Sequence, residues 1–188
     1  MNHRIHNFAA GPAALPTPVL EKMQSELLNF NGTGVSIMEM SHRGAVYTEV
    51  FLRTRDAFRR LLNIPDNYQI LFLQGGAIGE NAIIPLNLLG DATQGANQTI
   101  DSVISGAWSL KTQKEAARYA DTAPIIANSD DGQGRFTHFP EFDTWQRSAE
   151  SAYINICTNE TIHGVEWYPS RAASDAVHAS GSFFVADM

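Results

Sequence analysis

The sequence predicts an α/β protein in which a mostly parallel sheet is flanked by helices. Helical and strand patterns alternate along the 188 residues. The strand patterns are continuous apolar runs, which is typical of parallel strands buried on both faces. The composition, 44% hydrophobic and 18% charged, is that of an ordinary globular protein, and no repeat or linker divides the chain. We expect one domain, or a large piece of one.

The first 16 residues form a segment punctuated by Gly and Pro, and two helices are predicted after it. Thr17 followed by Pro18 predicts an N-cap with proline at the first helical position, and "NGTG" ends this helix. The apolar stripe of the helix consists of Leu20, Met23, Leu27 and Phe30. A second helix is predicted from about Ala45 to Leu62, before Pro65.

From residue 68 onward the pattern is strand, Gly-rich turn and helix. The run "YQILFLQ" (68–74) precedes a helix over 75–90, and "DSVISGAW" (101–108) precedes a helix over 109–120. Three further buried strands are predicted at "APIIAN", "AYINIC" and "SFFVADM". Ligands of open parallel sheets bind beyond the carboxyl ends of the strands, so residues at these ends are the candidates for function.

Charge and cysteine content restrict the partners. The formal net charge of -7 argues against a nucleic-acid partner or an acidic membrane surface, since both require a basic face. Cys157 is the single cysteine and therefore has no intrachain disulfide partner. No cationic leader with an apolar core, and no run of 18 apolar residues, is found in the sequence. We therefore expect a cytoplasmic protein.

The stretch "LQGGAIGE" predicts an anion site. Gly75 and Gly76 have no Cβ, so a ligand can approach the backbone closely, and the N–H groups of Gly76, Ala77 and Ile78 lie at the N-terminus of the next helix. A phosphate is the natural ligand. Because the stretch is neither G-x-G-x-x-G nor a P-loop, a plain strand-to-helix turn remains the alternative.

Four other positions carry candidate binding groups, each with a simpler structural alternative. Trp108 can stack on a flat aromatic ligand or pack in the core. Thr161 can donate to a ligand oxygen or organise a turn with Asn159. Asp187, at the end of an apolar strand, can pair with a cationic ring nitrogen or cap a loop. His42 and Arg43 can grip an anionic group, although a solvated Arg is the alternative.

The remaining histidines do not show metal-ligand spacing with Cys157 or with acidic residues, and we expect no metal site. The other candidates follow the ends of different strands. Together they suit pyridoxal 5'-phosphate, whose phosphate must be anchored, whose ring must be sandwiched and whose ring nitrogen must stay protonated.

Seven motifs carry a resemblance to a known family: "NFAAGPAALP", "GVSIMEMSHR", "FLQGGA", "IPLNLLG", "SGAW", "NETIHG" and "FFVADM". From Asn7 to the last residue the chain resembles the phosphoserine aminotransferases, which are pyridoxal-phosphate transaminases of the aspartate aminotransferase fold. The resemblance implies that residues 17–188 are part of the large, cofactor-binding domain of a fold-type I transaminase. It also implies that the C-terminal half and the small domain are absent.

The resemblance implies amino-group transfer between L-glutamate and 3-phosphohydroxypyruvate in serine biosynthesis, a related role in pyridoxine biosynthesis, and a homodimer. It assigns Gly76, Ala77 and Ile78 to the cofactor phosphate and Trp108 to ring stacking. Thr161 is assigned to the cofactor's O3′, and Asp187 to the ring nitrogen. It assigns His42 and Arg43 to the acidic group of the substrate. Some relatives have arginine where Ile78 stands, which removes a side-chain contribution to phosphate binding but not the backbone one.

The family's Schiff-base lysine follows the strand that carries the aspartate, in a segment that these 188 residues do not include. Lys22, Lys111 and Lys114 are the lysines of the sequence, and all three fall in helical patterns. We therefore expect no catalytic residue in this chain and no activity from it alone. Two alternatives remain: a non-catalytic truncated homologue that binds a phosphorylated ligand or acts as a dimerisation partner, and a related transaminase or desulfurase of the same fold.

Overall fold

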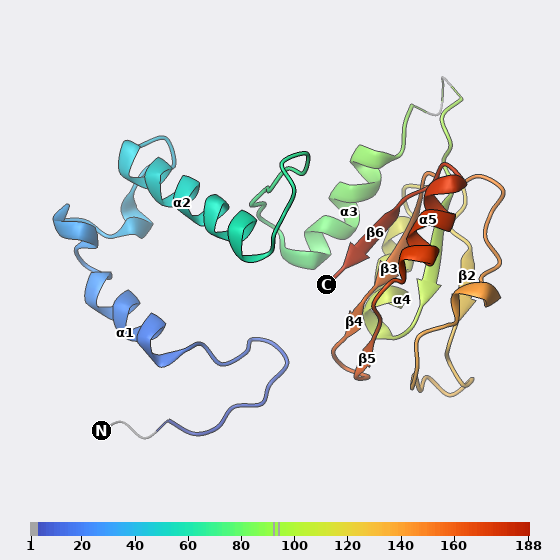
Figure 1. Ribbon diagram of the computed structural model, residues 1–188, viewed down its shortest axis with the longest axis horizontal. Coiled ribbons are helices and arrows are strands. Elements are labelled where there is room, and N and C mark those ends of the chain that lie inside the picture. The colour runs from blue at the N-terminus through green and yellow to red at the C-terminus, as the bar shows by residue number, and fades with distance from the viewer. Residues whose placement is uncertain (1–3, 92, 94) are drawn as a thin grey trace. The chain divides into compact units, whose positions relative to one another are not determined.

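The computed structural model describes residues 4–91, 93 and 95–188. The chain divides into two compact units, the first ending at Phe72 and the second running from Leu73 to Met188 (Figure 1). The division falls just before the Gly-rich stretch. Each unit is described by itself below.

The first unit consists of helices and connecting segments. Its elements are α1 (Thr17–Glu26), η1 (Phe30–Gly32), η2 (Ile37–Glu39) and α2 (Ala45–Leu61). The second helix therefore confirms the sequence prediction. Among the described residues of the first unit, Ser36 alone is buried. Large apolar side chains such as Met23 and Leu62 are exposed.

The first helix differs from the prediction at both ends. Its N-cap is Pro16 rather than Thr17, and the hydroxyl Oγ1 of Thr17 instead accepts a 2.6 Å hydrogen bond from Arg4. The helix ends at Glu26, so Phe30 of the expected stripe belongs to η1. The left-handed backbone of Asn31, with φ of 51°, is incompatible with a continuing helix.

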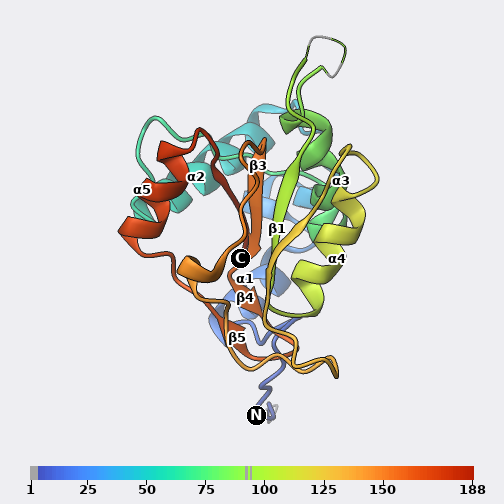
Figure 2. The same cartoon turned by 90° about the vertical axis from the view of Figure 1, so that its right-hand side faces the viewer.

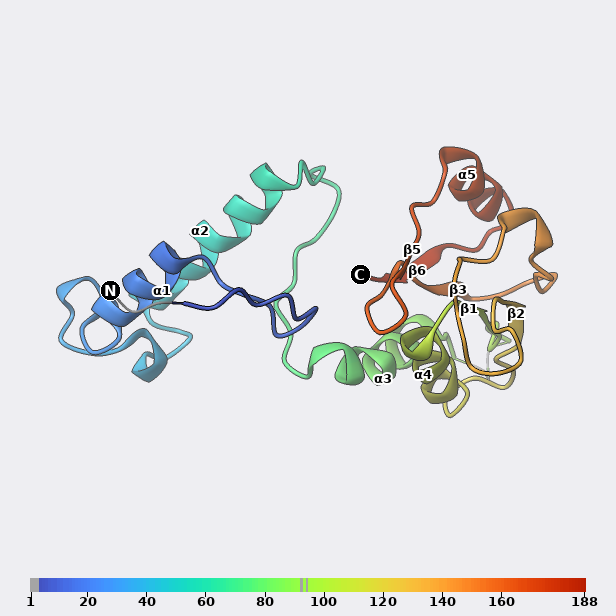
Figure 3. The same cartoon turned by 90° about the horizontal axis from the view of Figure 1, so that it is seen from below.

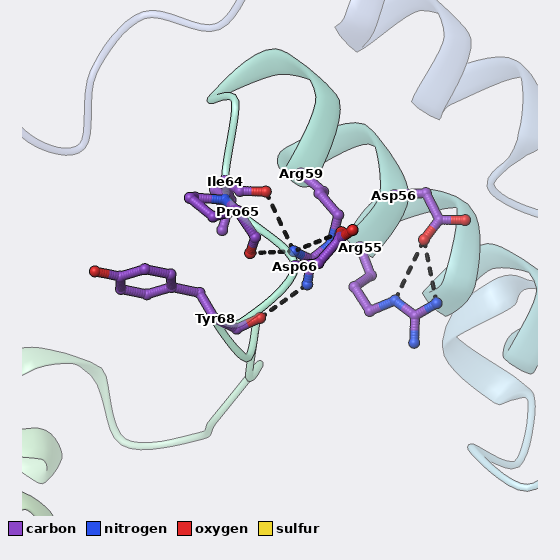
Figure 4. Close-up of polar contacts among 7 residues, drawn as sticks. All are labelled: Arg55, Asp56, Arg59, Ile64, Pro65, Asp66 and Tyr68. Atoms are coloured by element: carbon purple, nitrogen blue, oxygen red, sulfur yellow. Dashed lines mark hydrogen bonds and ion pairs between the residues drawn. The ribbon is translucent and has the colours of Figure 1, made fainter.

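The end of α2 is held by one arginine, shown in Figure 4. The guanidinium of Arg59 donates to the carbonyl oxygens of Ile64 at 3.2 Å, Pro65 at 2.6 Å and Tyr68 at 2.9 Å. Its distance to the exposed carboxylate of Asp66 is 3.7 Å. The guanidinium thus links three carbonyl groups of the loop that follows α2, of which that of Pro65 also accepts from the N–H of Tyr68 at 3.1 Å.

The second unit contains the predicted parallel sheet. Its strands are β1 (Ile100–Ile104), β2 (Ile125–Asn128), β3 (Tyr153–Cys157) and β6 (Phe184–Asp187), and its helices are α3 (Gly76–Leu88), α4 (Ala107–Ala116) and α5 (Arg171–Ala179). The strand order is β2-β1-β3-β6, and every pairing is parallel. Figure 2 shows α3 and α4 on one side of the sheet and α5 on the other.

Two hydrophobic clusters hold these layers together. Ile100 of β1, Ala116 of α4 and Tyr153 of β3 form one cluster, against which Ile84 of α3 packs. The other cluster contains Val103, Ile154 and, from α5, Val177, together with aromatic side chains such as Trp145. Burying these side chains contributes roughly 25 cal/mol per Å² of apolar surface removed from water.

One predicted strand is wrong. Residues 68–74 have no strand structure, and the side chains of Leu71 and Leu73 are exposed. A strand persists only where a neighbour pairs with its N–H and C=O groups, and no described segment pairs with this one. Apolar composition alone therefore did not make it a strand.

Several elements of the second unit were not predicted. The short strands β4 (Asn159–Glu160) and β5 (Val165–Glu166) form an antiparallel hairpin directly after β3. Helix α5 begins behind Ser170, whose hydroxyl accepts a 3.1 Å hydrogen bond from the N–H of Ala173. A third element, η4 (Phe142–Thr144), lies between β2 and β3.

Candidate functional site

Polar and aromatic groups gather at the carboxyl edge of the sheet. Because β1, β3 and β6 run parallel, their carboxyl ends meet at one edge. After β1 the chain enters α4 at Trp108, after β3 it enters the β4–β5 hairpin, and β6 ends at Asp187. Figure 3 shows the end of β6 beside this hairpin, and the N–H of Thr158 donates to the carbonyl oxygen of Asp187 at 2.8 Å.

The N-terminus of α3 offers backbone donors. Gly75 has φ of 126° and Gly76 of 59°, conformations that side chains rarely adopt, and a Cβ on Gly75 would lie 3.2 Å from the Cα of Gly79. No described residue accepts a hydrogen bond from the N–H of Gly76, Ala77 or Ile78. These free donors and the positive end of the helix dipole are suited to a phosphate. The Ile78 side chain is exposed and leaves them accessible.

The N-terminus of α4 is closed by a carboxylate. Glu160, which is fully buried, accepts hydrogen bonds from the N–H groups of Trp108 and Ser109, both at 2.8 Å. The hydroxyl of Ser109 donates to the same carboxylate at 2.5 Å. Anion binding at this helix end is therefore satisfied within the protein, in contrast to α3.

Trp108 and Thr161, both predicted site residues, are in contact. The indole Nε1–H of Trp108 donates to Oγ1 of Thr161 at 2.9 Å. Residue Trp108 is 36% exposed, and the ammonium of Lys111 lies 5.6 Å from the centroid of its ring. The indole is thus oriented at one edge and still presents surface on which a flat ring can stack.

Asp187 is a partly buried carboxyl group at the end of β6. It lies opposite Cys157 in the parallel register, and the thiol of Cys157 donates to its Oδ2 at 3.9 Å. Burial raises the pKa of Asp187 above its usual value, and the negative charge of Glu160 raises it further. No described Lys, Arg or His forms an ion pair with Asp187. A desolvated carboxylate of this kind is suited to a cationic ligand.

A cavity of about 150 Å³ joins two of the predicted groups. It is lined by Ala77 and Asn81 of α3, Asn155 of β3, and Asp187. The N-terminal end of α3 and the strand-end carboxylate therefore open onto one space. The structure brings the predicted residues together as two pairs, Ala77 with Asp187 and Trp108 with Thr161.

His42 and Arg43 belong to the other unit. Both are exposed and lie in the turn before α2, where the backbone N–H of Arg43 donates to Oγ of Ser41 at 3.3 Å. Their assignment to substrate binding stays a prediction.

Sequence reasoning missed Glu160 and the thiol of Cys157. A signal for Glu160 was present, because α4 begins at "GAWS" without an Asp, Asn, Ser or Thr at its N-cap, Gly106. A helix start of this kind leaves N–H groups for an acceptor from elsewhere in the chain, from a ligand or from water. The sequence alone did not indicate which residue supplies it.

The lysines and possible metal ligands complete the inventory of the site. Lys22 pairs with Glu26 at 2.7 Å within α1, whereas Lys111 and Lys114 lie on α4. In the part of the chain that the structure describes, no group of three or more His, Cys, Asp or Glu side chains could hold a metal ion. Within the same ranges, no helix is both long and apolar enough to cross a bilayer.

The open parallel sheet, with candidate ligand-binding groups at the carboxyl ends of its strands, is typical of α/β proteins that bind a ligand at this edge. Comparison with known families identifies the family to which the chain belongs. The aminotransferase class-V family model matches residues 5–188, and the chain belongs to that family. Among curated proteins, the phosphoserine aminotransferase of Janthinobacterium sp. (strain Marseille) is 52% identical over 87% of this chain, which covers 44% of that protein. The chain thus spans about half the length of the curated relatives that it matches.

Solved structures agree with this result. A phosphoserine aminotransferase studied for radiation damage of its Schiff base superposes with a TM-score of 0.83, with 38% identity over 98% of this chain and 48% of its own. A phosphoserine aminotransferase from Trichomonas vaginalis, described as PLP-bound, has a TM-score of 0.82 and 34% identity over 98% of this chain and 51% of its own. The α/β fold with a parallel sheet flanked by helices is therefore confirmed.

Proposed function

We propose that this chain is the cofactor-binding portion of a phosphoserine aminotransferase. The whole enzyme transfers the amino group between L-glutamate and 3-phosphohydroxypyruvate, forming phosphoserine and 2-oxoglutarate, in serine biosynthesis, with a related role in pyridoxine biosynthesis. The similarity to phosphoserine aminotransferases over 87% of the chain supports this proposal. In it, residues 1–16 form the N-terminal segment and residues 17–188 form part of the large domain.

Pyridoxal 5'-phosphate fits the residues at the carboxyl edge. The N–H groups of Gly76, Ala77 and Ile78 are free to hold its phosphate. The exposed indole of Trp108 can stack on its ring, and Thr161 can contact its O3′. When bound, the cofactor supplies an electron sink for amino-group transfer. The observation that carries the proposal is the partly buried carboxylate of Asp187, which forms no ion pair with any described side chain and lines the same cavity as Ala77.

The ring nitrogen and Asp187 support each other electrostatically. Burial makes ionisation of Asp187 costly, and a protonated ring nitrogen compensates for that cost with a charge-assisted hydrogen bond. In return, the carboxylate keeps the nitrogen protonated. The side chains of His42 and Arg43 are assigned to the distal acidic group of the substrate, and the assembly is a homodimer. The free, buried thiol of Cys157 fits a cytoplasmic setting.

We further propose that these 188 residues alone do not catalyse the reaction. Transamination needs a lysine amine to bind the cofactor covalently and to move a proton at the substrate α-carbon. Lys22 is paired in α1, and the exposed Lys111 and Lys114 lie along α4. Of these, Lys111 has its ammonium 5.6 Å from the Trp108 ring centroid, so Lys111→Ala is the control for adventitious attachment.

The test combines intact mass with absorbance between 300 and 500 nm after addition of pyridoxal 5'-phosphate. For the 188-residue chain, we expect non-covalent binding, no mass increase after borohydride reduction, and no turnover. For the complete product of its gene, we expect a borohydride-trapped adduct and turnover of L-glutamate with 3-phosphohydroxypyruvate. A complete gene product that neither binds the cofactor nor turns over these substrates would overturn the proposal. Turnover by the 188-residue chain at an ordinary enzyme rate would overturn the second part.

A further inference from the structure

Glu160 is a buried carboxylate that is not among the cofactor-binding residues proposed above. It is fully excluded from solvent, where an ionised carboxylate is costly unless donors surround it. All three of its donors belong to Trp108 and Ser109, in the first turn of α4. The carboxylate therefore ties the β4–β5 hairpin to the start of α4.

The residue next to Glu160 makes a second contact with the same tryptophan. Oε2 of Glu160 accepts from the backbone N–H of Trp108 at 2.8 Å, and Oγ1 of Thr161 accepts from its indole Nε1–H at 2.9 Å. Adjacent residues of one strand end thus hold the main chain and the ring edge of Trp108 at the same time. The first contact fixes the main chain from which the side chain projects, and the second limits rotation of the side chain about its bonds.

We propose that Glu160 is a positioning residue that sets the orientation of the Trp108 ring for stacking on the cofactor. This inference rests on the proposed function for the identity of the stacked ring, but not for the geometry of Trp108. In this role Glu160 acts through Trp108 and Thr161. Because its charge also raises the pKa of Asp187, the exchange of the indole N–H, measured without cofactor, is the readout that isolates the positioning of Trp108. Glu160→Gln replaces one of the two accepting oxygens by an NH2 group, so that the N–H groups of Trp108 and Ser109 must share one acceptor and the main chain that carries the Trp108 ring is held less firmly.

A matched control separates positioning from simple stability. Asp101 in β1 is also fully buried, and it accepts hydrogen bonds from the N–H of Ser148 at 3.1 Å and from its hydroxyl at 2.6 Å. It holds no residue of the proposed site. Asp101→Asn and Glu160→Gln therefore remove the same kind of buried carboxylate, and only the second should disturb Trp108.

The first measurement is hydrogen exchange of the Trp108 indole N–H, followed by NMR without cofactor in the complete gene product. We expect Glu160→Gln to speed this exchange at least tenfold and Asp101→Asn to leave it unchanged. The second measurement is the dissociation constant for pyridoxal 5'-phosphate. It should rise between roughly two- and tenfold in Glu160→Gln, the range of a lost aromatic stacking contact. In a Trp108→Ala background, Glu160→Gln should cause no further loss.

Unchanged indole exchange in Glu160→Gln would overturn the proposal, and so would an equal change in Asp101→Asn. If Glu160→Gln does not fold, Ser109→Ala removes one donor and keeps the carboxylate, and a smaller acceleration of the same exchange is expected. No acceleration in that variant also overturns the proposal. A wild-type protein that does not bind pyridoxal 5'-phosphate would instead defeat the proposed function, while indole exchange still decides the role of Glu160.

Discussion

Gly106 and Glu160 occupy adjoining space, so that a Cβ on residue 106 would overlap the Glu160 carboxyl group. The backbone of Gly106 is extended, with φ of 173°, so glycine is required here by space and not by conformation. The glycine after β1 and the glutamate after β3 are 54 residues apart, and they are complementary in size.

Substituting Gly106 by Ala should therefore destabilise the protein. The Glu160 carboxylate cannot move aside without losing its hydrogen bonds to α4, and overpacking of this kind costs about 1–3 kcal/mol. Urea unfolding measures the loss. Gly79→Ala is the control, because an added Cβ there meets its nearest neighbour at an ordinary 3.8 Å and Ala favours the helix. Equal stability of the two variants would contradict the prediction.

Cys157 should be unreactive in the folded protein. Burial is the main cause that raises the pKa of its thiol to about 12, and the nearby carboxylates add to the effect. At pH 8 the thiolate fraction is then about one in ten thousand, from the difference between the pH and that pKa. A coloured disulfide reagent should label no thiol without denaturant and one thiol per chain in urea. Prompt stoichiometric labelling of the folded chain would show that the thiol is accessible.

Asp187→Asn should have opposite effects on stability and on cofactor binding. The raised pKa of Asp187 means that its contribution to folding is present at low pH and is lost as pH rises through the folded-state value. At pH 7 the buried charge is a cost that Asn removes, so the cofactor-free variant should unfold at a higher temperature than the wild type. This difference should shrink toward pH 4.

Cofactor affinity should fall in the same Asp187→Asn variant, because Asn cannot hold the ring nitrogen protonated. The measurements are thermal unfolding at pH 7 and at lower pH, and titration with pyridoxal 5'-phosphate. Asp143→Asn, at an exposed position, is the control and should change stability by no more than about 0.5 kcal/mol. If cofactor-free Asp187→Asn unfolds at a lower temperature than the wild type at pH 7, the ionised Asp187 carboxylate does not destabilise the folded chain, and the prediction is wrong.

Arg59→Lys should loosen the loop after α2. A lysine ammonium cannot reproduce the planar fork that meets the carbonyl oxygens of Ile64, Pro65 and Tyr68, and the expected loss is roughly 1–3 kcal/mol. Hydrogen exchange over residues 62–68 should accelerate. Arg60→Lys, at an exposed position, is the matched control. Asp66→Asn should have little effect, because its carboxylate is fully exposed and the ion pair is weak. An Asp66→Asn effect as large as that of Arg59→Lys would assign the stabilisation to the ion pair.

The sequence was informative where structure depends on local pattern. Runs rich in apolar residues identified β1, β2, β3 and β6, because strands covered on both faces are mostly apolar, although Asp101 of β1 and Asn155 of β3 are buried polar residues. Residues 68–74 have the same pattern but no strand structure, because pairing depends on a neighbour that composition does not reveal. The β4–β5 hairpin was missed because strands of two residues are too short to show periodicity.

The strand ends that carry the candidate residues were predictable, but the contacts between these residues were not. Trp108, Thr161 and Asp187 were chosen because ligands of parallel sheets bind at the carboxyl ends of the strands, and their role in binding stays a prediction. The contact of Trp108 with Thr161 spans 53 residues, and that with Glu160 spans 52. Contacts at such separations are set by the order of strands in the sheet, which one sequence does not contain. Helix α5 could have been found, since Ser170 precedes Ala173 and Val177, which share one helix face.

The register of β3 has a consequence for how this edge of the sheet can vary. Main-chain hydrogen bonds pair Tyr153 with Ile100 on one side and Cys157 with Asp187 on the other. The backbone of β3 therefore sets two positions: that of the Asp187 carboxylate, through pairing with β6, and that of the β4–β5 hairpin, which follows β3 and contacts the Trp108 indole. Deleting one residue within β3 would turn every following side chain to the opposite face. It would also displace both the Asp187 carboxylate and the β4–β5 hairpin from the positions that the present register gives them.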